Sequence, residues 1–215
     1  MAFWKEKRVT VVKNAVDINK FCYNREKSEQ IKKQLGLKDN FVIGHTGRFT
    51  HQKNHQFLIQ IFNEIYKIDN NARLLLVGSG ELESEVRKQV KNLNLEDYVI
   101  FAGFQTDVSS YMQAMDSFVF PSKCEGLGLV LIEAQAAGLT CFTSKYVVPE
   151  EAKVSELLTF IPLEETPKTW AEEILKQKNS KRETPRSDIA KNGYDIYETA
   201  HFLQQYYIEK SNTCK

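Results

Sequence analysis

Two patterns of apolar positions alternate along the chain. Short continuous runs of leucine, aromatic and β-branched residues predict strands that are covered on both faces. These runs occupy residues 9–12, 41–44, 72–77, 98–101, 117–120 and 139–143. The longer stretches between them place apolar residues three or four positions apart, which predicts amphipathic helices over residues 24–34, 54–68, 80–92, 107–115 and 128–137.

Several of these helices carry residues typical of helix ends. Asn54 and Asp107 stand where an N-cap is expected, and Gly36 and Gly138 stand where a left-handed residue closes a helix. The strand–helix alternation continues for about 130 residues, which predicts parallel βαβ units. We therefore expect an α/β fold with a Rossmann-like, doubly wound parallel sheet that binds ligands at the carboxyl ends of its strands.

The last forty residues differ from this pattern. Residues 176–187 are charged and interrupted by a proline, which predicts an exposed linker. Residues 188–209 predict a helix or a helix pair, with apolar anchors at Tyr194, Tyr197, Phe202 and Tyr206.

Composition and charge then exclude several classes of protein. The 215 residues include 29 Lys or Arg and 28 Asp or Glu, a net charge of +1 that argues against a nucleic-acid binder. No apolar run approaches the roughly 18 residues of a membrane span, and the first residues lack a signal-peptide core. Four widely spaced cysteines, at positions 22, 124, 141 and 214, favour reduced thiols in the cytoplasm.

A first candidate site lies between a strand and a helix, at residues 44–54. Gly44 and Gly47 allow close approach of the backbone, and Arg48 and Lys53 place two cations near a helix N-terminus. This combination suits a diphosphate, although loop cations are also often merely solvated. The segment lacks the Gly-Lys-Ser/Thr of a Walker A loop.

A second candidate site covers residues 121–133. Glu125 lies in a glycine-containing loop after a strand, and Glu133 interrupts an otherwise apolar helix. A carboxylate in such a helix either faces solvent or accepts hydrogen bonds, for which ribose hydroxyls are suitable donors. The backbone amides of residues 126–129 open this helix and suit an anion.

The remaining motifs are interpreted as structural. Gly78 and Gly80 follow a strand as in a dinucleotide-binding motif, but Glu83 replaces the third glycine, so we expect a tight turn there. His51 and His55 have a zinc-compatible spacing, but no further ligand is evident in the sequence. There is also no Asp-x-Asp, so we expect no metal and no cofactor.

Taken in order, these segments resemble the C-terminal domain of retaining glycosyltransferases of the GT-B fold, family 4, of the bacterial capsular or exopolysaccharide type. The resemblance runs from about residue 9 to residue 170. It rests on Val-x-Asn-Ala-Val-Asp at 12–17, Gly47-Arg48 with Lys53-Asn54, Val77-Gly78-x-Gly80, Val99-x-Phe101-x-Gly103, Phe120-Pro121-Ser122, and a Glu-x7-Glu motif formed by Glu125 and Glu133. Two departures are Gly128 and Thr140, where relatives often have proline.

The resemblance implies a role for each matching residue. Arg48 and Lys53 would neutralise the donor diphosphate, and Glu125 would face the donor sugar, so these three are the expected catalytic residues. Glu133 would hold the ribose. The other expected donor-binding residues are Gly47, Gly78, Gly103, Phe104, Gly126, Leu127, Gly128 and Leu129.

The resemblance also implies that the acceptor-binding N-terminal domain is missing. We expect an interdomain linker remnant at residues 1–8, which includes Phe3-Trp4, a donor-binding domain at residues 9–180 and a C-terminal helical extension at residues 181–215. The expected partners are a nucleotide-sugar donor and the missing domain, with no nucleic acid. Peripheral contact of the full-length protein with the cytoplasmic membrane face, and self-association of this chain, are further expectations.

The leading hypothesis is a retaining hexosyltransferase half that uses a UDP-sugar in surface-polysaccharide biosynthesis and is inactive without its acceptor domain. Two alternatives stay open at this point: a non-catalytic nucleotide-sugar-binding module, and a sugar-nucleotide epimerase of the same fold. The sugar, nucleobase, acceptor and linkage are not determined by the sequence.

Overall fold

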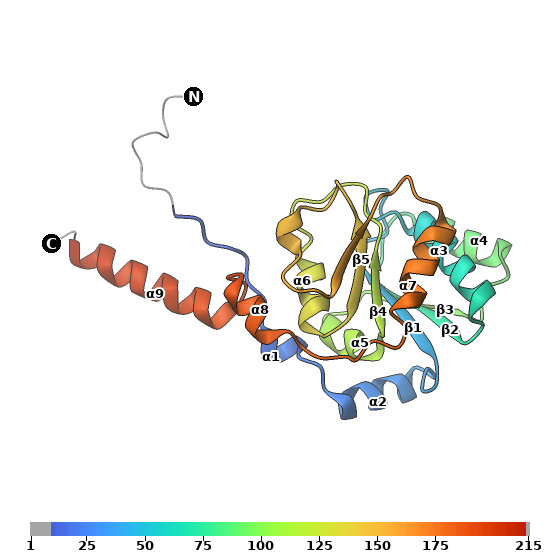
Figure 1. Ribbon diagram of the computed structural model, residues 1–215, viewed down its shortest axis with the longest axis horizontal. Coiled ribbons are helices and arrows are strands. Elements are labelled where there is room, and N and C mark those ends of the chain that lie inside the picture. The colour runs from blue at the N-terminus through green and yellow to red at the C-terminus, as the bar shows by residue number, and fades with distance from the viewer. Residues whose placement is uncertain (1–9, 214–215) are drawn as a thin grey trace, which may run out of the picture.

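A six-stranded parallel sheet forms the centre of the molecule (Figure 1). The computed structural model describes residues 10–213, so the expected linker at residues 1–8 and Val9 lie outside the described residues. The strand order β3-β2-β1-β4-β5-β6 reverses direction between β1 and β4, which confirms the doubly wound, Rossmann-like sheet. The strands are β1 (Phe41–Thr46), β2 (Ala72–Val77), β3 (Val99–Gly103), β4 (Ser117–Phe120), β5 (Thr140–Ser144) and β6 (Leu158–Ile161).

Helices cover both faces of the sheet and divide the core into two clusters. One cluster contains buried residues such as Leu58, Val90 and Trp170, contributed by α3 (His55–Ile68), α4 (Glu83–Asn92) and α7 (Pro167–Lys176). The other cluster is built from residues of α1 (Ile18–Phe21), α5 (Val108–Ala114), α6 (Leu129–Ala136) and α8 (Arg186–Lys191), and α2 (Arg25–Gln34) packs on α5. Three layers, helix–sheet–helix, result.

Most of the predicted elements are confirmed within a few residues, and one strand is wrong. The run at residues 9–12 is not a strand where the structure describes it: Val11 is 83% exposed. The β-branched residues of this run favour an extended backbone, but within residues 10–213 no strand pairs with residues 10–12. The structure also adds β6, the short 3-10 helix η1 (Glu150–Ala152) and α7, which the sequence pattern did not predict.

Asn54 occupies the predicted N-cap position of α3 but does not cap it. Its backbone is left-handed, with φ 57°, and its side chain makes no cap hydrogen bond. The Asn54 amide instead donates to the carbonyl of Pro121, at 3.0 Å. The side chain therefore joins the β1–α3 loop to the β4–α6 loop.

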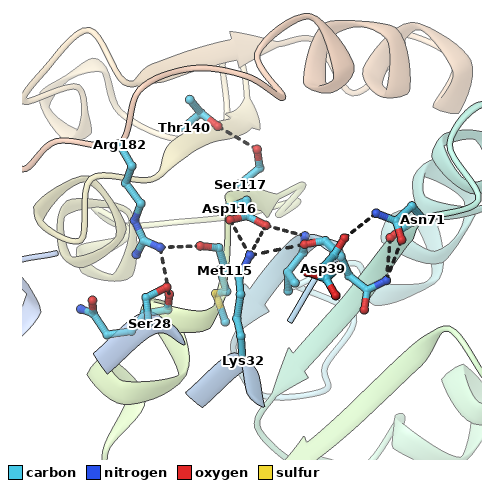
Figure 2. A network of polar contacts seen from close by, with 12 residues as sticks. Ser28, Lys32, Asp39, Asn71, Met115, Asp116, Ser117, Thr140 and Arg182 are labelled. Atoms are coloured by element: carbon cyan, nitrogen blue, oxygen red, sulfur yellow. Dashed lines mark hydrogen bonds and ion pairs between the residues drawn. The ribbon is translucent and has the colours of Figure 1, made fainter. Parts of the chain in front are cut away.

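A polar network fixes the amino-terminal edge of the sheet (Figure 2). The Lys32 ammonium lies 2.7 Å from the Asp116 carboxylate, which also accepts the backbone N–H of Val42 at 2.8 Å. The hydroxyls of Ser117 and Thr140 are 2.7 Å apart across β4 and β5. This network lies at the edge opposite to the carboxyl ends of the strands.

The prediction that residues 176–187 form an exposed linker is wrong at Arg182. The guanidinium of this residue is inserted into the body of the domain (Figure 2). Burial lowers its pKa to about 10. The guanidinium donates to four backbone carbonyls, those of Met112 (2.8 Å), Gln113 (2.9 Å), Met115 (2.7 Å) and Ala137 (2.9 Å). A domain boundary at residue 180 stays a prediction.

The final helix, α9 (Ile196–Thr213), extends away from the sheet (Figure 1). Tyr194, just before it, is buried, and the Val16 N–H donates to its carbonyl at 2.8 Å. Tyr197 and Phe202 are exposed, so the prediction that they anchor the helix is wrong. Among residues 10–213 no helix is both long and apolar enough to cross a bilayer.

Candidate functional site

The loops that follow β1, β2 and β3 are joined by backbone hydrogen bonds at the carboxyl edge of the sheet. The N–H of Gly47 donates to Val77 at 3.0 Å, and the N–H of Gly78 donates to Gly103 at 2.8 Å. The N–H of Phe49 donates to Ser79 at 3.1 Å. Three of the glycines expected to bind the donor therefore lie in one connected set of loops.

Close backbone contact explains the Gly78-Ser79-Gly80 motif. A Cβ on Gly78 would lie 2.1 Å from the carbonyl oxygen of Gly47, and a Cβ on Gly80 would lie 2.6 Å from the backbone of Phe49. Gly78 also has a φ of 141°, which favours glycine. The tight turn expected from the sequence is confirmed, and these glycines pack against the β1 loop.

A cleft of about 420 Å³ opens between these loops. Phe104, 74% exposed, stands on its wall together with Gln105, whose side-chain amide donates to Ala102 at 2.6 Å. A cleft of this size fits a nucleoside, and an exposed aromatic ring offers a stacking surface. The lining residues are Thr46, Gly47, Arg48, Val77, Gly78, Ser79, Gly80, Phe104, Gln105 and Val108.

Arg48 contributes a cation to this cleft from an exposed position. Its guanidinium lies 3.5 Å from the carboxylate of Glu81, and both side chains are mostly exposed. Such a surface pair is weak, about 0–1 kcal/mol, so Arg48 can exchange Glu81 for another anion at little cost.

Lys53, the second expected cation, forms a largely buried ion pair at the place where the strand order reverses, between β1 and β4. The Lys53 ammonium lies 2.6 Å from the Glu125 carboxylate, and their side chains are only 20% and 7% exposed. The ammonium also lies 4.6 Å from the centre of the Phe120 ring. Gln52 reinforces the contact, because its side chain donates to the Cys124 carbonyl at 2.6 Å.

The α6 N-terminus follows the Glu125 loop. Gly128 is left-handed, with φ 72°, and precedes the first helical residue, Leu129. Gly126 and Leu127 complete the turn, and a Cβ on Gly126 would meet no atom within 4 Å. This end of α6 is therefore uncrowded and directs free N–H groups toward the carboxyl edge.

Glu133 lies inside α6 and is half-buried. Burial raises the pKa of its carboxyl, opposed by the charge of Lys20. No hydrogen bond or ion pair holds this carboxylate within residues 10–213. The side chain is thus neither fully solvated nor satisfied, as expected of a group that receives hydroxyl donors from a ligand.

Sequence reasoning missed a buried histidine pair below the β1 loop. The rings of His45 and His55 are both buried, with centroids 4.6 Å apart. The sequence had paired His55 with His51 by helical spacing, whereas the sheet brings it to His45. The only signal for this was that the two histidines flank the Gly47–Lys53 segment.

The expected site residues thus fall into two groups that share one edge. Gly47, Arg48, Gly78 and Phe104 line the cleft, and Gly103 accepts a hydrogen bond from Gly78 beside it. Lys53, Glu125 and residues 126–129 form the adjoining loop pair, with Glu133 farther along α6. Within residues 10–213, no three His, Cys, Asp or Glu side chains gather as metal ligands. The absence of a metal or cofactor stays a prediction.

Fold and site together define a Rossmann-like half-domain of the GT-B class, with a cleft at the carboxyl edge of its sheet. Residues 27–195 match the model of the family described as glycosyl transferases group 1. The chain belongs to this family.

Individual relatives agree with this assignment. EpsF of Bacillus subtilis, named as a glycosyltransferase, is 32% identical over 207 residues, which is 94% of this chain and 54% of EpsF. CapM of Staphylococcus aureus, a capsular polysaccharide biosynthesis glycosyltransferase, is 34% identical over 88% of this chain and 50% of CapM. The chain spans about half the length of these relatives.

A solved structure gives the same result in three dimensions. Anabaena HepE in complex with UDP-glucose superposes with a TM-score of 0.73 and 25% identity. The match covers 93% of this chain and 57% of HepE. The sheet described above therefore corresponds to a part of HepE that makes up a little over half of that chain.

Proposed function

We propose that this chain binds the nucleotide-sugar donor, a UDP-sugar, for a retaining hexosyltransferase of surface-polysaccharide biosynthesis. The observation that supports the proposal is that Arg48 and Gly47 line a cleft at the strand-order reversal, and that Lys53, paired with Glu125, lies next to Gly47. HepE, which superposes on the chain, was crystallised with UDP-glucose, and CapM is named for capsular polysaccharide. In this proposal an acceptor domain of the kind expected from the sequence completes the active site, and the reaction is cytoplasmic.

In this proposal the nucleobase stacks on Phe104 and the ribose hydroxyls donate to Glu133. The diphosphate lies between Arg48 and Lys53, near the free amides of residues 126–129. Negative charge grows on the leaving diphosphate as the sugar–phosphate bond breaks, and the two cations stabilise it. Glu125 faces the sugar, where positive charge develops at the anomeric carbon.

The two ion pairs of Arg48 and Lys53 provide a scheme for binding of the nucleotide-sugar. The diphosphate replaces Glu81 as the partner of Arg48, which is a surface pair and costs little to open. It also draws Lys53 from Glu125, which leaves the carboxylate free to face the sugar. No metal is needed in this scheme, because two side-chain cations and a helix end supply the positive charge.

Calorimetric titration of the chain with UDP, UDP-glucose and a GDP-sugar tests the proposal. We expect UDP and UDP-glucose to bind and the GDP-sugar to bind more weakly. Absence of binding by every nucleotide at millimolar concentration would refute it. Sugar transfer is measured separately, and we expect none from this chain alone, because it spans only about half the length of EpsF and CapM.

A further inference from the structure

The sheet opens into a fork at the place where the proposed donor site is built. The paired residues of β1 and β2 extend to Thr46 and Val77, and those of β4 and β5 extend to Phe120 and Thr143. Between β1 and β4, by contrast, pairing ends at Gly44 and Phe118. The two central strands therefore separate before their carboxyl ends, and Lys53 and Glu125 follow from opposite sides of this fork.

The side chain of His45 closes the base of the fork. Its Nδ1 lies 2.8 Å from the carbonyl oxygen of Val119, one residue beyond the last paired position of each strand. A carbonyl can only accept, so Nδ1 carries the hydrogen and donates. A side chain thus continues the pairing of β1 with β4 where the backbone ladder has ended.

His45 also supports the loop above it. A Cβ on Gly47 would lie 3.0 Å from Nε2 of His45 and 3.4 Å from Cγ of Lys53, so Gly47 packs between the other two side chains. Nε2 has no hydrogen-bond partner within residues 10–213, and the ring is completely buried. Burial lowers the pKa of His45 to about 4, so the imidazole is neutral at pH 7 and adds no charge beneath the cations.

Farther along the fork, each contact between the two loops involves a residue near Lys53 or Glu125. Asn54 donates to Pro121 at 3.0 Å, the N–H of Lys123 donates to Gln52 at 2.8 Å, and Lys53 meets Glu125. His45 is the innermost of this series. These contacts join the two loops from the base of the fork to the ion pair.

We propose that His45 is a positioning residue of the donor site. Its Nδ1–H bond to Val119 fixes the width of the β1–β4 fork and so the distance between Lys53 and Glu125 and their approach to the donor. The assignment rests on the proposed function, since it names the residue that sets the geometry of that site. His45 touches no substrate in this role.

Two substitutions of His45 separate positioning from packing. His45→Phe keeps a planar ring of similar size but loses the N–H group that donates to Val119. His45→Asn loses ring volume but keeps an N–H at the position of Nδ1, attached to the same Cγ. If His45 only fills space, His45→Phe should be better than His45→Asn in both thermal stability and UDP affinity. If His45 positions the site, His45→Asn should instead bind UDP more tightly than His45→Phe.

His55→Phe is the matched control. His55 is also a buried histidine, stacked on Phe49 with ring centroids 4.0 Å apart, but neither of its nitrogens has a hydrogen-bond partner within residues 10–213. The same histidine-to-phenylalanine exchange there removes no hydrogen bond.

The experiment measures UDP affinity by calorimetry and thermal unfolding by circular dichroism for the 215-residue chain and these three variants. We expect His45→Phe to weaken UDP binding about tenfold or more, since small displacements at a charged site are costly. His45→Asn and His55→Phe should remain within about threefold of the unsubstituted chain. Wild-type affinity in His45→Phe, or an equal loss in His45→Asn, would overturn the inference.

Amide hydrogen exchange of residues 121–128 provides a readout that needs no nucleotide. We expect faster exchange there in His45→Phe than in His45→Asn or His55→Phe, and equal rates would overturn the inference. If UDP fails to bind the unsubstituted chain, the proposed function fails while this comparison still decides the role of His45. His45→Leu, which also lacks the N–H group, replaces His45→Phe if that variant does not fold.

Discussion

The ammonium of Lys53 and the carboxylate of Glu125 are 2.6 Å apart although 72 residues separate them in the chain. Both side chains are largely removed from solvent, and each follows a different central strand of the sheet. Opposite charges at such a position hold the two loops together. In the proposed function the same ammonium binds the donor diphosphate, so that stability and donor binding depend on one contact.

Substitution of Lys53 by alanine should affect both properties. We expect a loss of about 3 kcal/mol in the free energy of unfolding, because the buried Glu125 carboxylate is left without its partner. UDP affinity, measured by calorimetry, should fall by more than tenfold, or about 1.4 kcal/mol. The double variant Lys53→Met/Glu125→Gln should recover stability but not affinity.

Lys176→Ala is the matched control for this substitution. Lys176 pairs with Glu173 on the exposed side of α7, so we expect changes of less than about 0.5 kcal/mol in stability and none in UDP affinity. Equal effects of the Lys53 and Lys176 substitutions on UDP binding would contradict the assigned role of Lys53.

A pair of glycine substitutions tests the contact between the β1 and β2 loops. Gly78→Ala should destabilise the fold by more than about 2 kcal/mol, because its Cβ meets the Gly47 carbonyl and its φ is positive. Gly126→Ala should be nearly neutral, because its Cβ enters open space. Denaturant unfolding measures both, and similar values for the two variants would argue against this packing.

Glu133 gives a prediction with a definite pH dependence. Because the folded state raises the pKa of this carboxyl, the folded protein binds its proton more readily than the unfolded chain. Stability should therefore decrease as pH rises from about 4.5, the ordinary value, through the raised pKa, and the penalty is complete above it.

Glu133→Gln removes this penalty. At pH 7 the variant should unfold at a higher denaturant concentration than the wild-type chain, and the difference should vanish near pH 4, where the wild-type carboxyl is protonated. Its UDP affinity should nevertheless be lower if the carboxylate holds the ribose. A variant that is less stable than wild type at pH 7 would contradict the burial argument.

The buried histidines shift stability in the opposite direction. Burial lowers the pKa of His45 to about 4 and that of His55 to about 2, below the ordinary 6.5, so the unfolded chain takes up protons that the folded protein excludes. Stability is complete above about pH 6.5 and declines below it, by about 1.4 kcal/mol per pH unit for each histidine.

His55→Phe isolates one of the two contributions. Between pH 6.5 and pH 5, we expect its unfolding free energy to fall less steeply than that of the wild-type chain, by up to about 1.4 kcal/mol per pH unit, because one titrating group is removed. Chemical denaturation at several pH values measures the slope. An unchanged slope would show that His55 does not titrate on unfolding.

The sequence predicted most strands and helices because their apolar patterns are local. Val42, Leu75 and Val119 lie in runs whose burial needs no knowledge of the partners. The run at residues 9–12 failed for the same reason, because local preference for an extended backbone supplies no neighbouring strand. The prediction that Tyr197 and Phe202 anchor the final helix was wrong for a similar reason, because the spacing of apolar residues does not show which surface they face.

The candidate site was predicted in its residues but not in its contacts. Arg48, Lys53 and Glu125 were recognised from motifs, yet their pairing with Glu81 and with each other depends on strand order. The His45–Val119 bond was invisible to sequence reasoning, because it joins residues 74 apart through the fork between two strands. Such contacts follow from topology rather than from spacing along the chain.

Arg182 has a practical consequence for where this polypeptide can be shortened. The Arg182 guanidinium donates to four backbone carbonyls at the C-terminal ends of α5 and α6. Arg182 itself follows α7 in the chain. A fragment that ends at residue 180 discards that side chain and leaves those carbonyls unmet, and it also loses Ile189 and Tyr194 from the core. A fragment that ends just after residue 195 keeps all three, and the projecting α9 becomes the dispensable part for expression and crystallisation of the domain.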